Sequence, residues 1–226
     1  MAMGWSEPRV RPVERGRTVL SVLNAIFRLI PSTLLLVAIY VVSFYLLDTR
    51  VGYTSEAENV LADPAWWMSW GHVSLVLTFF SIMLTNRAHG ALMALGQVVL
   101  SWAIIASLLV FAGYTYGFAE VRTELMPMQV MWAFLIGLFS GHVAAIYLFD
   151  WQRGVPWWKA PLLASLAGPI VFVLMFYSFG YWGADVPWGT WLWTHYLVLV
   201  GAGLVLMGPY AMLRRSIRPA PGHGGA

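Results

Sequence analysis

The chain contains no cysteine and carries few charges, and each absence excludes a class of protein. Of its 226 residues only 10% are Asp, Glu, Lys or Arg, whereas a water-soluble domain carries about 25%. Without cysteine the chain can form no disulfide, no thiolate nucleophile, no cysteine-ligated zinc site and no iron–sulfur cluster. Lysine occurs once, at Lys159 on the edge of an apolar segment, so no lysine is placed to hold retinal inside a membrane.

What the chain has in abundance is apolar and aromatic side chains. Hydrophobic residues make up 60% of the sequence, which includes 13 Trp, 12 Phe and 10 Tyr. Such an aromatic content is typical of membrane proteins, whose Trp and Tyr residues collect at the two interfaces. The net charge of +3 is small, and no nucleic acid is expected as a partner. The composition favours a protein embedded in a lipid bilayer.

Six apolar stretches are long enough to cross a bilayer as helices, which takes about 20 residues each. They cover approximately residues 29–47, 66–85, 91–114, 127–149, 160–180 and 190–213. The strands of a membrane barrel would be about 10 residues long and alternate in polarity, and no segment shows that pattern. The sequence therefore predicts an all-α integral membrane protein with six transmembrane helices in one bundle.

The positions of the basic residues predict the orientation of these helices. Eleven of the 13 Lys and Arg residues fall on one side, and only Arg50 and Arg122 fall on the other, together with seven of the ten acidic residues. We therefore expect both termini in the cytoplasm of a bacterial-type inner (plasma) membrane. The chain divides into a basic N-terminal segment (1–28), the transmembrane domain (29–213) and a disordered tail (214–226).

Three histidines lie within the apolar stretches, where an ionisable side chain suggests a functional site. His72 and His195 both lie roughly 8–9 Å beneath the same boundary of the bilayer, at a rise of 1.5 Å per residue. Glu124, Gln129 and Asp185 are predicted near that boundary. Imidazole combined with carboxylate or amide oxygen suits copper, zinc or iron. The alternative is that each histidine forms one hydrogen bond to a neighbouring helix.

His142 lies near the middle of its predicted helix, beside small residues in Ser140-Gly141-His142. This setting favours close packing of two helices, with a haem or quinone contact as the alternative. Three histidines at unequal depths do not support two haems, because each haem of a di-haem cytochrome b needs two axial ligands. One haem b or one quinone at His142 is left as a hypothesis.

Several short stretches, taken in order along the chain, resemble one integral subunit of the copper-containing membrane monooxygenases, the family that oxidises ammonia and methane. The similar stretches are Ala38-Ile39-Tyr40 with Phe44-Tyr45-Leu46, Trp67-Met68, Arg122-Thr123-Glu124 with Pro127, Arg153 with Pro156-Trp157-Trp158, Gly168-Pro169, Trp182-Gly183, His195-Tyr196 and Met207-Gly208. The family's subunit is also a six-helix protein with a cytoplasmic N-terminus. The resemblance implies an integral subunit of a larger hetero-oligomeric membrane complex.

The resemblance also implies copper that activates dioxygen to hydroxylate ammonia, methane or a small hydrocarbon, with electrons from quinol. The sequence departs from the family at the copper ligands: Gly180 and Ala184 stand where the second site has Asn and His, and only His195 matches. Gln129 stands near the position of a histidine of the first site. A relocated copper site would consist of His195 and His72, completed by Glu124, Gln129 or Asp185.

The sequence is compatible with two functions other than that of a monooxygenase-like subunit. The first is a non-catalytic structural or assembly subunit of a membrane complex, in which the histidines only join helices. The second is a haem-binding or quinone-binding anchor of a respiratory complex, with His142 as the ligand.

Overall fold

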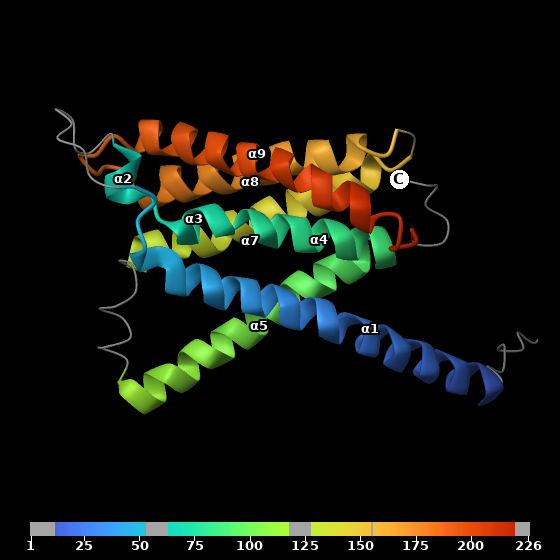
Figure 1. Cartoon of the computed structure of the whole chain (residues 1–226). Coiled ribbons are helices and arrows are strands. Elements are labelled where there is room, and N and C mark those ends of the chain that lie inside the picture. Colours follow the sequence, from blue (N-terminus) through green and yellow to red (C-terminus); the bar gives the residue numbers. More distant parts are fainter. Residues whose placement is uncertain (1–11, 53–62, 118–127, 155, 220–226) are drawn as a thin grey trace, which may run out of the picture.

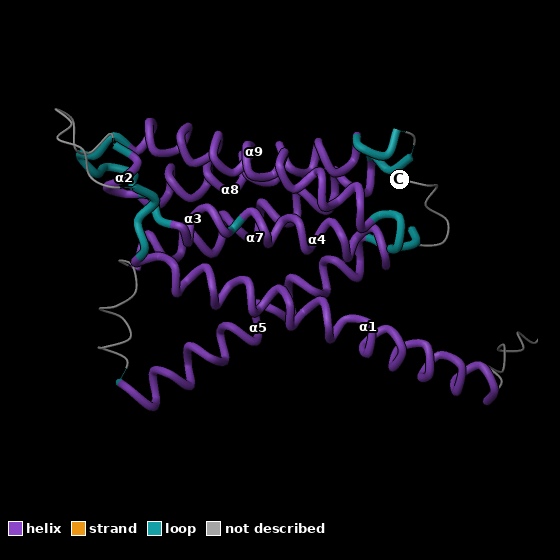
Figure 2. The backbone as a smooth tube through the Cα atoms, viewed as in Figure 1, coloured by secondary structure: helices purple, strands orange, loops and turns teal. Residues whose placement is uncertain are grey.

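The computed structural model describes residues 12–52, 63–117, 128–154 and 156–219, and the regular structure in these ranges is helical (Figure 2). Within the same ranges, one isolated bridge pairs Arg50 with Ser69. Five of the described helices are long and apolar enough to cross a membrane. The prediction of an all-helical, multi-pass membrane protein is confirmed at this level.

The helices lie roughly along one common direction, apart from α1 and α5, which cross it (Figure 1). In chain order they are α1 (Pro12–Tyr45), the 3-10 helix η1 (Leu46–Asp48), α2 (Pro64–Trp67), α3 (Trp70–Ser74), α4 (Val76–His89), α5 (Ala91–Tyr116), α7 (Met128–Trp151), α8 (Lys159–Gly180) and α9 (Trp188–Leu213). The apolar part of α1 covers Ile26–Asp48. Five of the six predicted spans thus agree with the structure to within a few residues.

The remaining predicted span, 66–85, is wrong as a continuous helix. It is divided into α2, α3 and α4, with interruptions after Trp67 and at Leu75. Side-chain hydroxyl groups donate hydrogen bonds to backbone carbonyls around the second interruption. Ser74 donates to the Gly71 carbonyl at 2.9 Å, and Thr78 donates to the Leu75 carbonyl at 2.6 Å. Such bonds to the preceding turn compete with the helical ladder and bend helices.

The most extensive contact in the bundle joins α7 and α8, and glycine makes it possible. A Cβ atom on Gly141 would lie 2.7 Å from the Gly168 carbonyl oxygen and 2.9 Å from Cβ of Phe172. The two helices therefore approach at a distance that only glycine allows, as is common for helix pairs in membranes. This is the close packing predicted from Ser140-Gly141-His142.

Helices α1 and α5 cross in an X, and their far halves project from the bundle in different directions (Figure 1). Near the crossing, the Tyr40 and Trp102 rings lie 5.4 Å apart. The Gln97 amide donates to the Ser32 carbonyl at 2.7 Å and to the Ser81 hydroxyl at 3.1 Å. Buried polar contacts thus join α1, α4 and α5 where the three helices meet.

Helix α1 crosses the first predicted domain boundary, and the second boundary coincides with the end of α9. Helix α1 begins at Pro12, within the N-terminal segment predicted as 1–28. At the other end, the tail predicted to be disordered from 214 starts with a hydrogen-bonded turn, in which the Ile217 N–H donates to the Leu213 carbonyl at 2.9 Å. Residues 1–11 and 220–226 lie outside the described part of the chain.

Candidate functional site

The structure brings together His72 and His195, the two histidines that the sequence placed at equal depth. His72 lies on the short helix α3 and His195 on α9. Their rings meet edge to face, with centroids 5.2 Å apart and planes at 85°. Phe172 and Tyr177 of α8 also pack edge to face against the His195 ring. Three helices therefore enclose the pair, and His195 is fully buried.

The Nδ1 atom of each histidine lies beside a hydroxyl oxygen. For His195 this is the Tyr177 hydroxyl at 3.1 Å, and for His72 it is the Ser69 hydroxyl at 2.9 Å. Either oxygen can accept a hydrogen bond from Nδ1–H, which fixes the tautomer of the ring and leaves the Nε2 lone pair available. In the other tautomer of His72, Nδ1 accepts a hydrogen bond from the Ser69 backbone N–H at 3.2 Å, which caps the start of α3.

The Nε2 atom of His195 is left without a strong partner. Nε2 of His195 is buried and makes no hydrogen bond within ordinary limits, although the His72 backbone lies nearby. Both hydrogen bonds that the His72 ring makes within the described residues involve Nδ1. A buried nitrogen without a partner is costly and calls for an explanation, such as an ion or a water molecule.

The spacing of the rings can be compared with that of two ligands of one ion. Imidazoles bound to one tetrahedral ion, through bonds of about 2.0–2.1 Å, have centroids roughly 5 Å apart. The separation of 5.2 Å agrees with this geometry. However, no group of three or more His, Cys, Asp or Glu side chains that could hold a metal occurs within the described ranges. The pair supplies two ligands, and an ion there would need at least one more.

The other predicted ligands do not join the pair in the described structure. The Gln129 amide, at the start of α7, donates to the Phe179 carbonyl at 2.9 Å. Asp185 is exposed in the connection between α8 and α9. Glu124 lies outside the described residues. The structure therefore brings the two histidines together, and Gln129 and Asp185 are not assembled around them.

His142 differs from the pair because both of its ring nitrogens are occupied. The Thr78 hydroxyl donates to the Leu75 carbonyl, so its oxygen accepts from His142 Nε2 at 2.9 Å. Nδ1 of His142 then accepts from the Tyr40 hydroxyl at 3.3 Å. The ring is fully buried and lies edge to face against Phe79. His142 thus joins α1, α4 and α7, and a haem or quinone could bind it only by displacing one of these partners.

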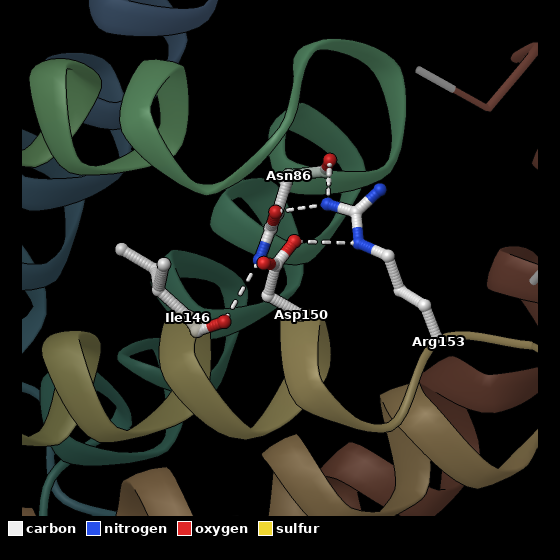
Figure 3. A network of polar contacts seen from close by, with 4 residues as sticks. All are labelled: Asn86, Ile146, Asp150 and Arg153. Atoms are coloured by element: carbon white, nitrogen blue, oxygen red, sulfur yellow. Dashed lines mark hydrogen bonds and ion pairs between the residues drawn. The ribbon is translucent and has the colours of Figure 1, made fainter. Parts of the chain in front are cut away.

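A second polar group lies at the opposite end of the bundle, where α4 and α7 end (Figure 3). The Arg153 guanidinium donates to the side-chain and backbone oxygens of Asn86 and forms an ion pair with Asp150, with Nε 2.8 Å from the carboxylate. The Asn86 amide donates to the Ile146 carbonyl at 3.0 Å. Burial lowers the pKa of Arg153 and nearby Arg87 adds to this, whereas Asp150 raises it. The network ties the connection after α7 to α4.

Three residues of these polar groups were missed from the sequence. Tyr177 precedes His195 by 18 positions on another helix, and no local pattern predicts that they meet. Ser69 gave a signal, because Ser followed three residues later by a hydrogen-bonding side chain is typical of a capping box, and the structure has one with His72 in the third place. Asn86 gave none.

The chain was compared with protein-family models, with curated proteins and with solved structures. None of the three comparisons finds a match.

Proposed function

We propose that the chain is an integral membrane subunit that binds copper through His72 and His195, within a monooxygenase-like complex. The observation that carries the proposal is how the nitrogen atoms of the two imidazole rings are partnered. Each has a hydroxyl oxygen at Nδ1, and the buried Nε2 of His195 makes no hydrogen bond within ordinary limits. Histidines that bind metals almost always donate their other N–H to such an acceptor, which orients the ring.

The residues around the pair have distinct roles in this proposal. Tyr177 would hold the tautomer of His195. Ser69 would do the same for His72 in the tautomer in which the Ser69 hydroxyl oxygen, and not the Ser69 backbone N–H, is the partner of Nδ1. The stacked rings of Trp67 and Trp191, with centroids 5.6 Å apart, continue the aromatic packing beside Tyr177. Apolar surroundings of this kind limit the access of water to a metal site.

Bound copper would supply the redox chemistry that activates dioxygen for hydroxylation. The substrates, ammonia, methane or a small hydrocarbon, follow from the resemblance of the sequence to the monooxygenase family. The same resemblance suggests that other membrane subunits complete the complex and provide the remaining ligands. Copper fits the nitrogen donors present, since imidazole is a common ligand for copper and zinc.

The topology proposed for this subunit has six spans with both termini in the cytoplasm. From Trp70 to His89, α3 and α4 together cover about 30 Å at 1.5 Å per residue, enough to cross the hydrocarbon core as a bent span. Reporters can test this arrangement. One fused after Met212 should be cytoplasmic, and one inserted near Asn59 should be on the other side of a bacterial inner membrane.

The second candidate is a non-catalytic structural or assembly subunit, and the setting of His142 favours it. That histidine uses both nitrogens to join helices, so a histidine in this bundle can serve packing alone. The same observation makes a haem-binding or quinone-binding anchor the weakest of the three functions.

Metal analysis of the purified protein distinguishes these candidates. We would measure copper, zinc and iron per chain, and record an optical spectrum, for the wild type and for His72→Ala, His195→Ala and His142→Ala. Our proposal predicts stoichiometric copper that is lost in the first two variants and retained in the third. Equal metal content in all four proteins would overturn it in favour of the structural subunit, and a Soret band lost with His142 would favour the haem anchor.

A further inference from the structure

The end of α3 and the length of α4 carry a stripe of small polar side chains that faces the interior of the bundle. The stripe consists of Ser74, Thr78, Ser81 and Thr85. Their spacing of four, three and four residues places them on one face of a helix. Leu75, at the interruption, keeps helical dihedral angles (φ −57°, ψ −24°), so the face continues across it. Thr78, Ser81 and Thr85 are at most 5% exposed.

Small polar residues often serve only to pack membrane helices, but the neighbours of this stripe keep unused hydrogen-bonding atoms. Gln97 of α5 is fully buried, and its amide nitrogen donates to the Ser81 hydroxyl at 3.1 Å. Its Oε1 atom has no hydrogen-bond partner among the described residues, and the buried Thr33 hydroxyl of α1 has none either. Buried water molecules normally occupy positions beside such atoms.

His142 adds an ionisable side chain to the middle of the stripe. Its Nε2–H donates to the Thr78 oxygen at 2.9 Å, and its Nδ1 accepts from the Tyr40 hydroxyl at 3.3 Å. An imidazole bonded on both sides can accept a proton at one nitrogen while it releases the proton on the other. Histidines inside a membrane that are connected to other polar groups in this way are typical of proton relays.

At one end the stripe reaches the network of Asn86, Arg153 and Asp150 (Figure 3). Asn86 follows Thr85 directly in α4, and its side-chain oxygen accepts from Arg153. Asp150, the ion-pair partner of Arg153, is 32% exposed, so its carboxylate can exchange protons with water. In the proposed topology this end of the bundle faces the cytoplasm.

At the other end the stripe approaches the connection that follows α1. The Ser74 hydroxyl donates to the Ser43 hydroxyl at 2.8 Å. Ser69, five residues before Ser74, pairs through its backbone with the exposed Arg50. Ser69 and Asn86 are 17 residues apart, or about 25 Å along α3 and α4, which is most of the roughly 30 Å of hydrocarbon. Polar side chains therefore extend through most of the thickness of the bilayer.

We propose that this stripe, completed by water molecules, conducts protons through the bundle. Successive positions of the stripe rise by about 4.5–6 Å along the helix. One water molecule that makes two hydrogen bonds of about 2.8 Å can bridge such a step. The Oε1 atom of Gln97 and the hydroxyl of Thr33 would hold water molecules beside the stripe.

The transfer changes only the position of a proton. Each hydroxyl or water accepts one proton and gives up another. His142 accepts a proton at Nδ1 and releases the one on Nε2 to the Thr78 oxygen, and a flip of the ring then restores its tautomer. No oxidant or reductant is consumed. The path does not depend on the proposed copper, because neither His72 nor His195 takes part in it.

Proton flux into liposomes that contain the purified protein tests the proposal. A pH-sensitive dye inside the vesicles reports the flux after a pH step, with valinomycin and potassium present to remove the opposing potential. We expect a flux well above that of protein-free vesicles. Gln97→Leu and Thr78→Val should each lower it about tenfold, which corresponds to a barrier higher by about 1.4 kcal/mol. Thr78→Ser, which keeps the hydroxyl, should retain it.

Ser107→Ala is the matched control, because this hydroxyl is exposed on α5 and donates within its own helix, to the Ala103 carbonyl. It should leave the flux unchanged. A wild-type flux no greater than that of protein-free vesicles would overturn the proposal, and so would equal fluxes for the wild type, Gln97→Leu and Thr78→Val. A sodium flux as large as the proton flux, measured without valinomycin, would show an ion pore instead of a proton path.

Discussion

The hydroxyl of Tyr177 lies 3.1 Å from Nδ1 of His195, and the direction of the hydrogen bond between them determines which nitrogen of the ring carries the proton. When the phenol oxygen accepts Nδ1–H, the lone pair on the buried Nε2 is available to a metal ion. His72 can adopt the same arrangement with the Ser69 hydroxyl, at 2.9 Å, in the tautomer in which the Ser69 backbone N–H no longer donates to its Nδ1. The hydroxyl partners of the two histidines, which lie outside the pair itself, therefore provide the sharpest tests of the proposed copper site.

Replacing Tyr177 with Phe keeps the aromatic packing and removes only the hydroxyl. We expect copper affinity to fall about 10–100-fold, the usual cost of losing the group that orients a metal-binding histidine. Competition with a copper chelator, followed by titration, measures the change. Trp191→Phe, which alters the aromatic packing next to Tyr177 without touching Nδ1 of His195, is the control. The same affinity in Tyr177→Phe and the wild type would contradict the role assigned to the phenol.

Replacing His142 with Phe should cost stability and leave metal binding unchanged. The change removes two hydrogen bonds in the bundle, each worth about 0.6 kcal/mol on average in membrane proteins. We therefore expect the free energy of unfolding in a denaturing detergent titration to fall by about 1 kcal/mol. A loss of metal or of a visible chromophore in this variant would instead show that His142 binds a cofactor.

The sequence predicted the helices better than it predicted their interruptions. Long apolar segments bounded by Pro, Gly or charge give a strong signal, and the structure has helices at five of the six. The sixth fails because Ser74 and Thr78 look like ordinary polar positions in a helix. Only the structure shows that their hydroxyls capture the Gly71 and Leu75 carbonyls of the preceding turns.

Only the depth of the candidate site in the bilayer could be predicted from the sequence. Counting residues from the boundary placed His72 and His195 at the same level, which is a one-dimensional statement about each helix. Gln129 was predicted near the same boundary but bonds to Phe179. Its direction depends on how α7 is rotated against α8. Tyr177 was missed for the same reason, because rotation about a helix axis is set by packing between helices.

Gly141 should tolerate no side chain, even the smallest. A Cβ atom there would lie 2.7 Å from the Gly168 carbonyl oxygen, which belongs to the backbone and cannot move aside cheaply. We expect Gly141→Ala to lower the free energy of unfolding by about 1–3 kcal/mol through overpacking. Gly201→Ala is the matched control, since nothing lies within 4 Å of its Cβ position. It should leave stability unchanged or raise it by up to about 1 kcal/mol through helix propensity. Equal effects of the two changes would show that the close approach of α7 and α8 does not matter.

Asn86 should be essential for the stability of the end of the bundle where α4 meets α7. Asn86→Leu removes the side-chain bond to Arg153 and the bond to the Ile146 carbonyl (Figure 3). Each buried group left without a partner costs about 1–3 kcal/mol, so the melting temperature should drop clearly. Gln129→Leu, which removes one bond at an exposed amide, should have a much smaller effect. A melting temperature for Asn86→Leu no lower than that of Gln129→Leu would refute the proposed role of this network.

Whether one copper ion lies between His72 and His195 can be determined by X-ray absorption of the copper-loaded protein. We expect scattering from two imidazole rings in the wild type, and from one ring in whatever copper is retained by His72→Ala. Two rings are also expected in His142→Phe, because that histidine lies outside the site. A wild-type spectrum without imidazole scattering, or one that His195→Ala leaves unchanged, would show that the pair does not bind the ion.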